Sequence, residues 1–118
     1  MAASNPLPDP KWKNARSFPR FATDLPVQVE VLGGGETLAG RLLDIGLGGA
    51  CVLLEASGLP ARQKVVLEFR FPMSSAPLRL RATLRHRHRE DHYGFQFVEV
   101  RGEERETIRR ACAGLRIV

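Results

Sequence analysis

Six short stretches of this chain read as strands separated by turn signals, and this pattern constrains the fold more than any other feature. In the clearest stretch, Val27, Val29 and Val31 are separated by polar residues, which is the period-2 pattern of a strand with one buried face. Short strands separated by glycine- and proline-containing turns predict an all-β fold, a small six-stranded antiparallel β-barrel. The six predicted strands cover residues 25–32, 37–43, 50–55, 64–71, 78–88 and 93–100.

The stretch 102–115 has a different period and predicts a C-terminal α-helix. Ile108, Cys112 and Leu115 recur at helical spacing and form one apolar stripe, as expected of a helix that packs on a core. Glutamates in the first turns and arginines near the end suit the helix dipole. We expect this helix to cover an open end or an edge of the barrel.

The length of 118 residues accommodates one small domain. Residues 1–14 are polar and rich in proline, which favours extended chain, so we expect a flexible N-terminal tail followed by a domain over residues 15–118. The chain has neither an apolar run of about 18 residues nor a stretch that resembles a signal peptide. The expected location is the cytoplasm, with no membrane insertion.

The net charge is +5, with 18 basic and 13 acidic residues, and this balance favours an anionic partner. Alternation along the fifth strand predicts a stripe of four arginines on one face, either exposed to solvent or in contact with nucleic acid or an acidic protein. Few aromatic residues lie between them, so bases would lack a stacking platform, which weighs against nucleic acid. The four are Arg79, Arg81, Arg85 and Arg87.

No pattern in the chain indicates catalysis or a bound cofactor. There is no nucleophile–base pair and no phosphate-binding glycine loop before a helix, so we do not expect an enzyme. His86, His88 and His92 lack matching carboxylates or thiolates for zinc; rim packing, or contact of His86 or His88 with a bound purine, are the alternatives. Cys51 and Cys112 are too few for a disulfide framework and are interpreted as small buried hydrophobic residues.

Two short motifs carry the functional signal. Arg16 and Arg20 lie in a proline-broken segment just before the first strand, and Asp44 opens a turn that contains Gly46 and Gly49. Arginine binds phosphate bidentately and can also contact guanine. A carboxylate accepts hydrogen bonds from a guanine edge, and a glycine lets a ligand approach the backbone. Together the motifs predict a site for an anionic purine nucleotide.

In this order and strand context, the two motifs resemble those of the PilZ family of bacterial cyclic-di-GMP receptors. The resemblance covers nearly the whole chain, including Asp24-Leu25-Pro26-Val27 at the first strand and Tyr93-Gly94-Phe95-Gln96-Phe97 in the last. It implies a PilZ-type six-stranded barrel with a C-terminal helix. It also implies that Arg16 and Arg20 clamp cyclic di-GMP, and that Asp44, Gly46 and Gly49 receive it on the barrel surface.

The sequence departs from the family pattern at Gly46, where the pattern has a serine whose hydroxyl contacts the ligand. Glycine removes this contact, and a hydrogen bond to a charged group contributes about 1.5–3 kcal/mol. Because the proline-rich tail lies next to the arginine clamp, we hypothesise a cyclic-di-GMP receptor that signals through ligand-induced ordering of its N-terminal segment and then engages a protein partner. The alternative is a degenerate PilZ domain that acts as a ligand-independent protein-interaction adaptor.

Overall fold

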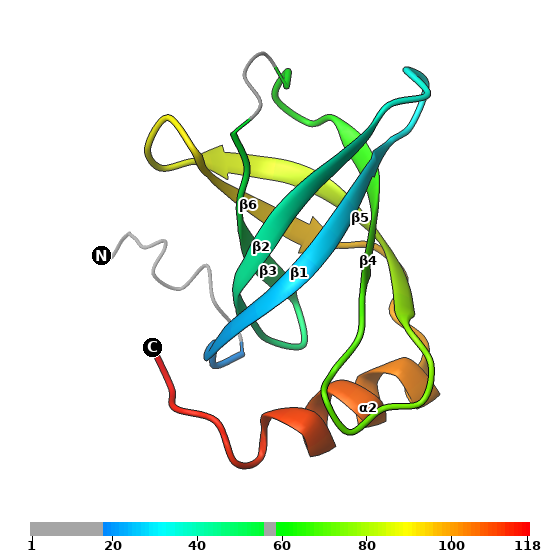
Figure 1. The fold of residues 1–118 in the computed structure, drawn as a ribbon, viewed down its shortest axis with the longest axis vertical. Helices are drawn as coiled ribbons and strands as arrows, with labels where there is room; N and C mark the ends of the chain where they lie inside the picture. Colours follow the sequence, from blue (N-terminus) through cyan, green and yellow to red (C-terminus); the bar gives the residue numbers. More distant parts are fainter. Residues whose placement is uncertain (1–17, 56–58) are drawn as a thin grey trace, which may run out of the picture.

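The computed structural model describes residues 18–55 and 59–118, which form a closed six-stranded barrel with a helix across one end (Figure 1). The barrel closes in the order β1-β2-β3-β6-β5-β4, with β4 paired to β1 and every pairing antiparallel. The predicted all-β barrel with a C-terminal helix is therefore confirmed. The elements are β1 (Phe21–Val31), β2 (Thr37–Ile45), β3 (Gly49–Leu53), β4 (Lys64–Phe69), β5 (Leu78–Arg87), β6 (His92–Phe97) and α2 (Gly102–Cys112).

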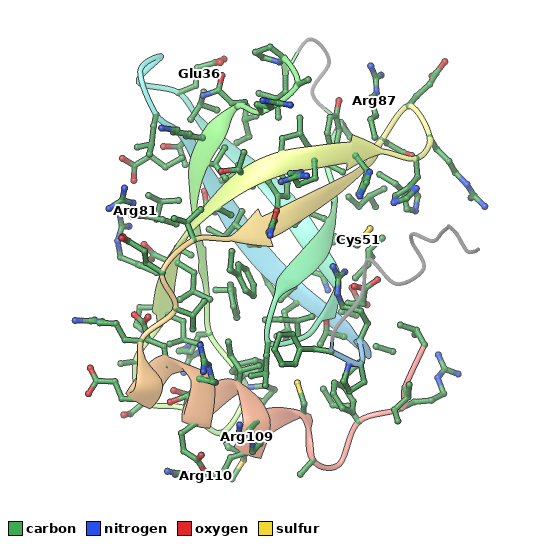
Figure 2. The ribbon with its side chains drawn as sticks, turned by 180° about the vertical axis from the view of Figure 1, so that it is seen from behind. Glu36, Cys51, Arg81, Arg87, Arg109 and Arg110 are labelled. Atoms are coloured by element: carbon green, nitrogen blue, oxygen red, sulfur yellow. The ribbon has the colours of Figure 1, made fainter. Side chains whose placement is uncertain are left out.

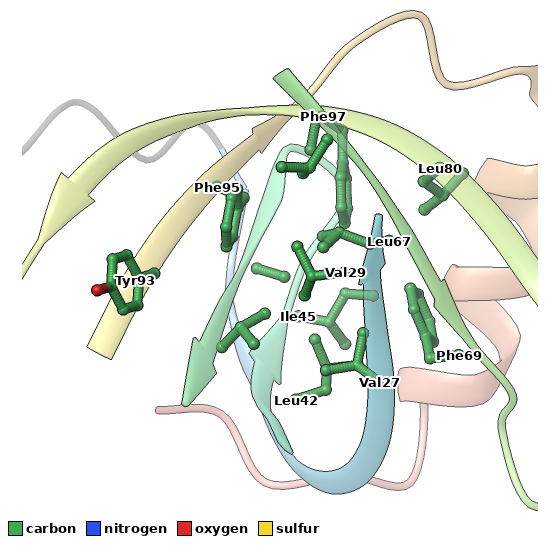
Figure 3. Packing of buried hydrophobic residues seen from close by; sticks show 14 of the residues in the cluster. Val27, Val29, Leu42, Ile45, Leu67, Phe69, Leu80, Tyr93, Phe95 and Phe97 are labelled. Carbon is green, nitrogen blue, oxygen red and sulfur yellow. The ribbon is translucent and has the colours of Figure 1, made fainter. Parts of the chain in front are cut away.

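Alternate residues of each strand point inward and fill the barrel with apolar side chains (Figure 3). Figure 3 shows Tyr93 at one end of this cluster and Phe69 toward the other. No polar or charged side chain among residues 18–55 and 59–118 is buried. Burying one large apolar side chain contributes roughly 1.5–3 kcal/mol, so the core, rather than surface ion pairs, holds the barrel together.

Helix α2 packs on this core through the stripe that the sequence predicted. Ile108 and Cys112 are buried, and Ala111 and Leu115 pack partly buried against the cluster. At the N-terminus of the helix, the Glu104 carboxylate accepts a 3.0 Å hydrogen bond from the backbone N–H of Arg101, which satisfies an otherwise unpaired donor.

The boundaries of all six strands differ from the prediction at one end or both, most of all at the start of β1. β1 begins at Phe21 rather than at residue 25. Phe21 pairs with Ile45 of β2, and Ala22 pairs with Asp44 of the same strand. An irregularity between Ala22 and Leu25 interrupts the alternation there, so the sequence pattern did not show it. Asp44 accordingly belongs to the end of β2 rather than to the turn, which is a correction to the sequence interpretation.

A bulge in β5 overturns the predicted faces of its last residues. Leu84 pairs with Phe95 and His86 pairs with Gly94, so Arg85 is an extra residue that shifts the alternation by one position. His86 therefore lies on the outer face, not on the apolar face with Leu84. Arg87 leaves the predicted arginine stripe, and its guanidinium lies over the ring of Tyr93, 5.5 Å from the centroid. Figure 2 shows Arg81 and Arg87 toward opposite ends of this strand.

The two cysteines have different environments. Cys112 is buried, as expected, and burial raises the pKa of its thiol. Cys51 is only partly buried, because it points outward from β3 between the inward-facing residues Ala50 and Val52. Its prediction as a buried residue was wrong.

The expected tail, residues 1–14, lies outside the described residues, as does Arg16. Within the described part of the chain, no helix has the length and apolar character needed to cross a membrane.

Candidate functional site

An ion pair joins the two predicted motifs on the outside of the barrel. The Arg20 Nη1 donates a 2.9 Å hydrogen bond to Asp44 Oδ1. Both side chains are mostly shielded from solvent, with 17% of Arg20 and 16% of Asp44 exposed. Arg20 is the residue just before β1 and Asp44 is near the end of β2. The pairing of β1 with β2 therefore brings together residues that are 24 positions apart.

A bulge in β2 turns Asp44 outward. Leu42 pairs with Val52 and Asp44 pairs with Cys51, with an irregularity between them. Leu42 and Ile45 are both fully buried although they are three positions apart, so Leu43 is the extra residue. Without it, strict alternation would place Asp44 on the same inner face as Leu42. The bulge thus puts the carboxylate where Arg20 can reach it.

The glycines of the turn after β2 allow three backbone segments to meet closely. The Gly46 N–H donates to the Gly49 carbonyl at 2.9 Å, and the Phe97 N–H donates to the Gly48 carbonyl at 2.9 Å. A Cβ on Gly46 would collide with the carbonyl oxygen of Pro19, and one on Gly49 would collide with that of Phe95. Real Cβ atoms do not approach backbone so closely, so both positions require glycine in this arrangement.

Gly49 also lies beneath the Arg20 side chain. A Cβ at Gly49 would be 3.1 Å from the Arg20 Nη2, so the guanidinium spans from the Asp44 carboxylate to the glycine turn. A guanidinium has five N–H donors, and Asp44 takes one of them. Arg20 therefore has further N–H donors besides the one bonded to Asp44, and its Nη2 lies next to Gly49.

The C-terminal residues fix the segment that carries Arg20. The Val118 N–H donates to the Arg20 carbonyl at 2.9 Å, and the Ala22 N–H donates to the Arg116 carbonyl at 2.7 Å. An isolated antiparallel bridge between Phe21 and Ile117 lies between these two bonds. The chain after α2 returns to the base of β1 (Figure 1). No signal in the sequence indicated this pairing, because it depends on the path of the chain after the helix.

Of the five predicted site residues, the structure brings together Arg20, Asp44, Gly46 and Gly49, and Arg16 lies outside the described residues. The structure also assigns Gly46 a packing role against Pro19 that the motif alone did not reveal.

Arginines on the outer face of β5 form ion pairs or hydrogen bonds with side chains of other strands. Arg79 pairs with Glu30 at 2.9 Å and with Glu68, and the hydrogen bonds that it donates to Glu30 and then to Glu68 raise the pKa of Arg79. Arg85 Nη1 donates to the Gln96 side chain at 2.6 Å. The outer face of β5 therefore alternates cations with acidic or amide partners instead of presenting a continuous basic stripe.

The histidines do not come together as a metal site within residues 18–55 and 59–118, where no group of three or more His, Cys, Asp and Glu side chains could hold a metal ion. His92 Nδ1 is 2.8 Å from Asp91 Oδ1, and this hydrogen bond lowers the pKa of Asp91. His86 and His88 lie next to each other, with ring centroids 5.7 Å apart.

Solved structures of similar shape share this barrel. The motility inhibitor MotI/DgrA of Bacillus subtilis superposes with a TM-score of 0.70 at 18% identity, over 82% of this chain and 49% of that one. The PilZ domain of YcgR from Escherichia coli, solved with c-di-GMP, gives a TM-score of 0.67 at 21% identity, over 85% and 90% of the two chains. The PilZ domain of CeSA from a cellulose-synthesizing bacterium gives 0.64 at 20% identity, over 80% and 95%.

This chain thus spans about half the length of MotI/DgrA. No curated protein matches its sequence. The PilZ domain family matches residues 14–114, which include both motifs, all six strands and α2. The chain belongs to the PilZ domain family.

Proposed function

We propose that this chain is a receptor for cyclic di-GMP and that the ligand binds across Arg20, Asp44 and the Gly46–Gly49 turn. PilZ domains are binding domains rather than enzymes. The observation that carries the proposal is the shielded Arg20–Asp44 pair beside two glycines at which backbone packs closely. The PilZ domain of YcgR, a structural relative, was solved with c-di-GMP.

The chemistry of the two side chains fits this ligand. The spare donors of the Arg20 guanidinium can bind a phosphate in bidentate fashion or the O6 and N7 atoms of guanine. The Asp44 carboxylate accepts hydrogen bonds only, and the Watson–Crick edge of guanine presents N–H donors. Ligand binding would exchange part of the internal Arg20–Asp44 bond for bonds to phosphate and base.

The proposal includes a signalling step in the N-terminal segment. Arg16 is placed four positions before Arg20 in the sequence, and we assign it as the second clamp on the ligand. Binding would order residues 1–15 against the barrel and create a surface for a protein partner. Hydrogen exchange over residues 1–22 tests this step, and exchange unchanged at saturating ligand would contradict it. By its relatives from Bacillus subtilis and Escherichia coli, we assign the receptor to the bacterial cytoplasm.

Calorimetric titration of cyclic di-GMP tests the receptor function. We expect saturable binding to the wild-type protein and its loss in Arg20→Ala. The matched control is Arg41→Ala, because Arg41 also pairs with an aspartate, Asp24, but at an exposed position. Saturation at about 100 times the Kd should also add about 2.7 kcal/mol of stability. Absence of both heat and thermal shift in the wild type would refute the proposal.

The second candidate, a ligand-independent adaptor, is favoured by the packing of Pro19 on Gly46. In that arrangement Arg20 is already paired with Asp44, and the turn carries no hydroxyl for a ligand. An adaptor would show no binding in the titration above, whereas its protein partner would bind the wild type and Arg20→Ala equally well.

A further inference from the structure

Strand pairing places four residues in one row on the outside of the barrel. Asp44 pairs with Cys51, Cys51 with Gly94, and Gly94 with His86. Residues directly opposite each other in antiparallel strands point to the same face. Asp44 and His86 are therefore three strand spacings apart, about 14 Å along the surface, with the small residues Cys51 and Gly94 between them.

The far end of this row carries two imidazole rings. A Cβ on Gly94 would lie 3.5 Å from His86 Cβ and Cδ2 and 3.7 Å from His88 Nε2, so both side chains border the bare backbone of Gly94. Their ring centroids are 5.7 Å apart and their planes differ by 36°. Both residues are exposed. Gly94 itself is buried, so the exposed surface at this end of the row is formed by the two imidazole rings beside it.

The two ends of the row face outward for the same reason. The extra residue in β2 turns Asp44 outward, and the extra residue in β5 does the same for His86. Bulges are over-represented next to binding sites, where they redirect a side chain. Without the β5 bulge, His86 would share the inner face with Leu84.

We propose that His86 and His88 form the second half of the ligand site, where they stack against one purine base of a cyclic dinucleotide whose other base and phosphate lie at Arg20 and Asp44. This inference rests on the proposed receptor function, and it extends the ligand site from Asp44 to the His86 end of the row. One nucleotide held at Asp44 would not reach across three strand spacings, whereas a dinucleotide offers a second base. Stacking on an aromatic side chain tolerates any base.

The test is calorimetric titration of cyclic di-GMP into the wild type and the double variant His86→Ala/His88→Ala. Loss of base stacking is expected to weaken binding about 5- to 10-fold. The variant His86→Phe/His88→Phe should restore most of the affinity, because it retains flat rings. The matched control is His92→Ala, since the His92 ring bonds to Asp91 rather than bordering Gly94, and it should leave the affinity unchanged.

A second readout separates stacking from a structural role. The ring protons of His86 and His88 should shift in the NMR spectrum as ligand is added, through the ring current of the purine, while those of His92 stay in place. If the wild type binds, Arg20→Ala loses binding, and the double variant binds like the wild type with unmoved ring signals, this inference is overturned and the receptor function stands. If the wild type itself does not bind, the receptor function fails and this inference with it.

Discussion

The carbonyl oxygen of Pro19 lies on the Cα of Gly46, too close to leave room for a Cβ at position 46. The lack of a side chain at position 46 is therefore a packing requirement, whatever its effect on ligand contact. A glycine at this position lets the segment leading into β1 lie directly on the turn after β2. The placement of that segment orients the Arg20 side chain toward Asp44. Any side chain at position 46 would have to displace Pro19, and Arg20 with it.

Two substitutions at position 46 should separate packing from ligand contact. Gly46→Ala adds only the Cβ, and we expect it to lower the stability by about 1–3 kcal/mol, as overpacking does, and to weaken cyclic-di-GMP binding because Arg20 is displaced. Gly46→Ser adds the same Cβ and a hydroxyl. We expect it to bind the ligand about 10-fold more tightly than Gly46→Ala does. Thermal unfolding and calorimetry measure both effects, and a wild-type-like Gly46→Ala would contradict the packing argument.

The Arg20–Asp44 pair should be more strongly coupled than an exposed ion pair between β1 and β2. Arg41 and Asp24 also form an ion pair, but their side chains are 43% and 75% exposed. Exposed pairs contribute about 0.2–1 kcal/mol, whereas shielding from water strengthens the interaction. Double-mutant cycles to alanine, measured by urea unfolding, should give a coupling energy of about 1 kcal/mol or more for Arg20–Asp44 and less than that for Arg41–Asp24. Equal values would show that the shielding has no effect.

The sequence predicted the barrel and the helix from local periodicity, whereas the juxtaposition of Arg20 with Asp44 was an expectation from the family resemblance. The sequence interpretation placed Asp44 in the turn rather than in β2 and His86 on the inner face rather than the outer one, and each of these positions depends on one extra residue in a strand. A bulge leaves no periodic signature, because it interrupts the alternation that sequence interpretation relies on. The packing of Pro19 on Gly46 was likewise hidden, because it involves residues that are 27 positions apart and meet only through pairing.

The C-terminal residues should stabilise the base of β1 through a single backbone bond at position 118. Val118→Pro removes the N–H that donates to the Arg20 carbonyl, whereas Val118→Ala keeps it and serves as the control. We expect Val118→Pro to accelerate hydrogen exchange of the Ala22 amide, which donates to the Arg116 carbonyl within the same bridge. The loss in stability should be about 0.5–1.5 kcal/mol. If exchange at Ala22 were the same in both variants, the bridge would not act as a unit.

Cys51 offers a chemical probe of the surface between Asp44 and His86. It is partly exposed and lies in the row between the two, so iodoacetamide should alkylate it in the folded protein. Saturating cyclic di-GMP should slow this reaction, because the ligand would cover the row. Arg20→Ala provides the control, since ligand should give no protection in that variant. Protection in neither protein, despite measured binding to the wild type, would place the ligand away from this row.

Cys112 should make the stability of the protein fall at alkaline pH. Burial raises the pKa of its thiol above the ordinary value of 9.0, so the folded protein holds this proton more tightly than the unfolded chain does. Its contribution is fully present below pH 9.0 and is lost as the pH rises from there through the raised value, because the thiol ionises first in the unfolded chain.

Cys112→Ala removes this titration while keeping a small apolar side chain at the site. The wild type should therefore lose more stability than Cys112→Ala between pH 8 and pH 10 (roughly one pH unit on either side of the thiol's ordinary pKa), as measured by urea unfolding at each pH. Parallel curves for the wild type and Cys112→Ala would mean that the helix opens readily enough for the thiol to ionise without unfolding.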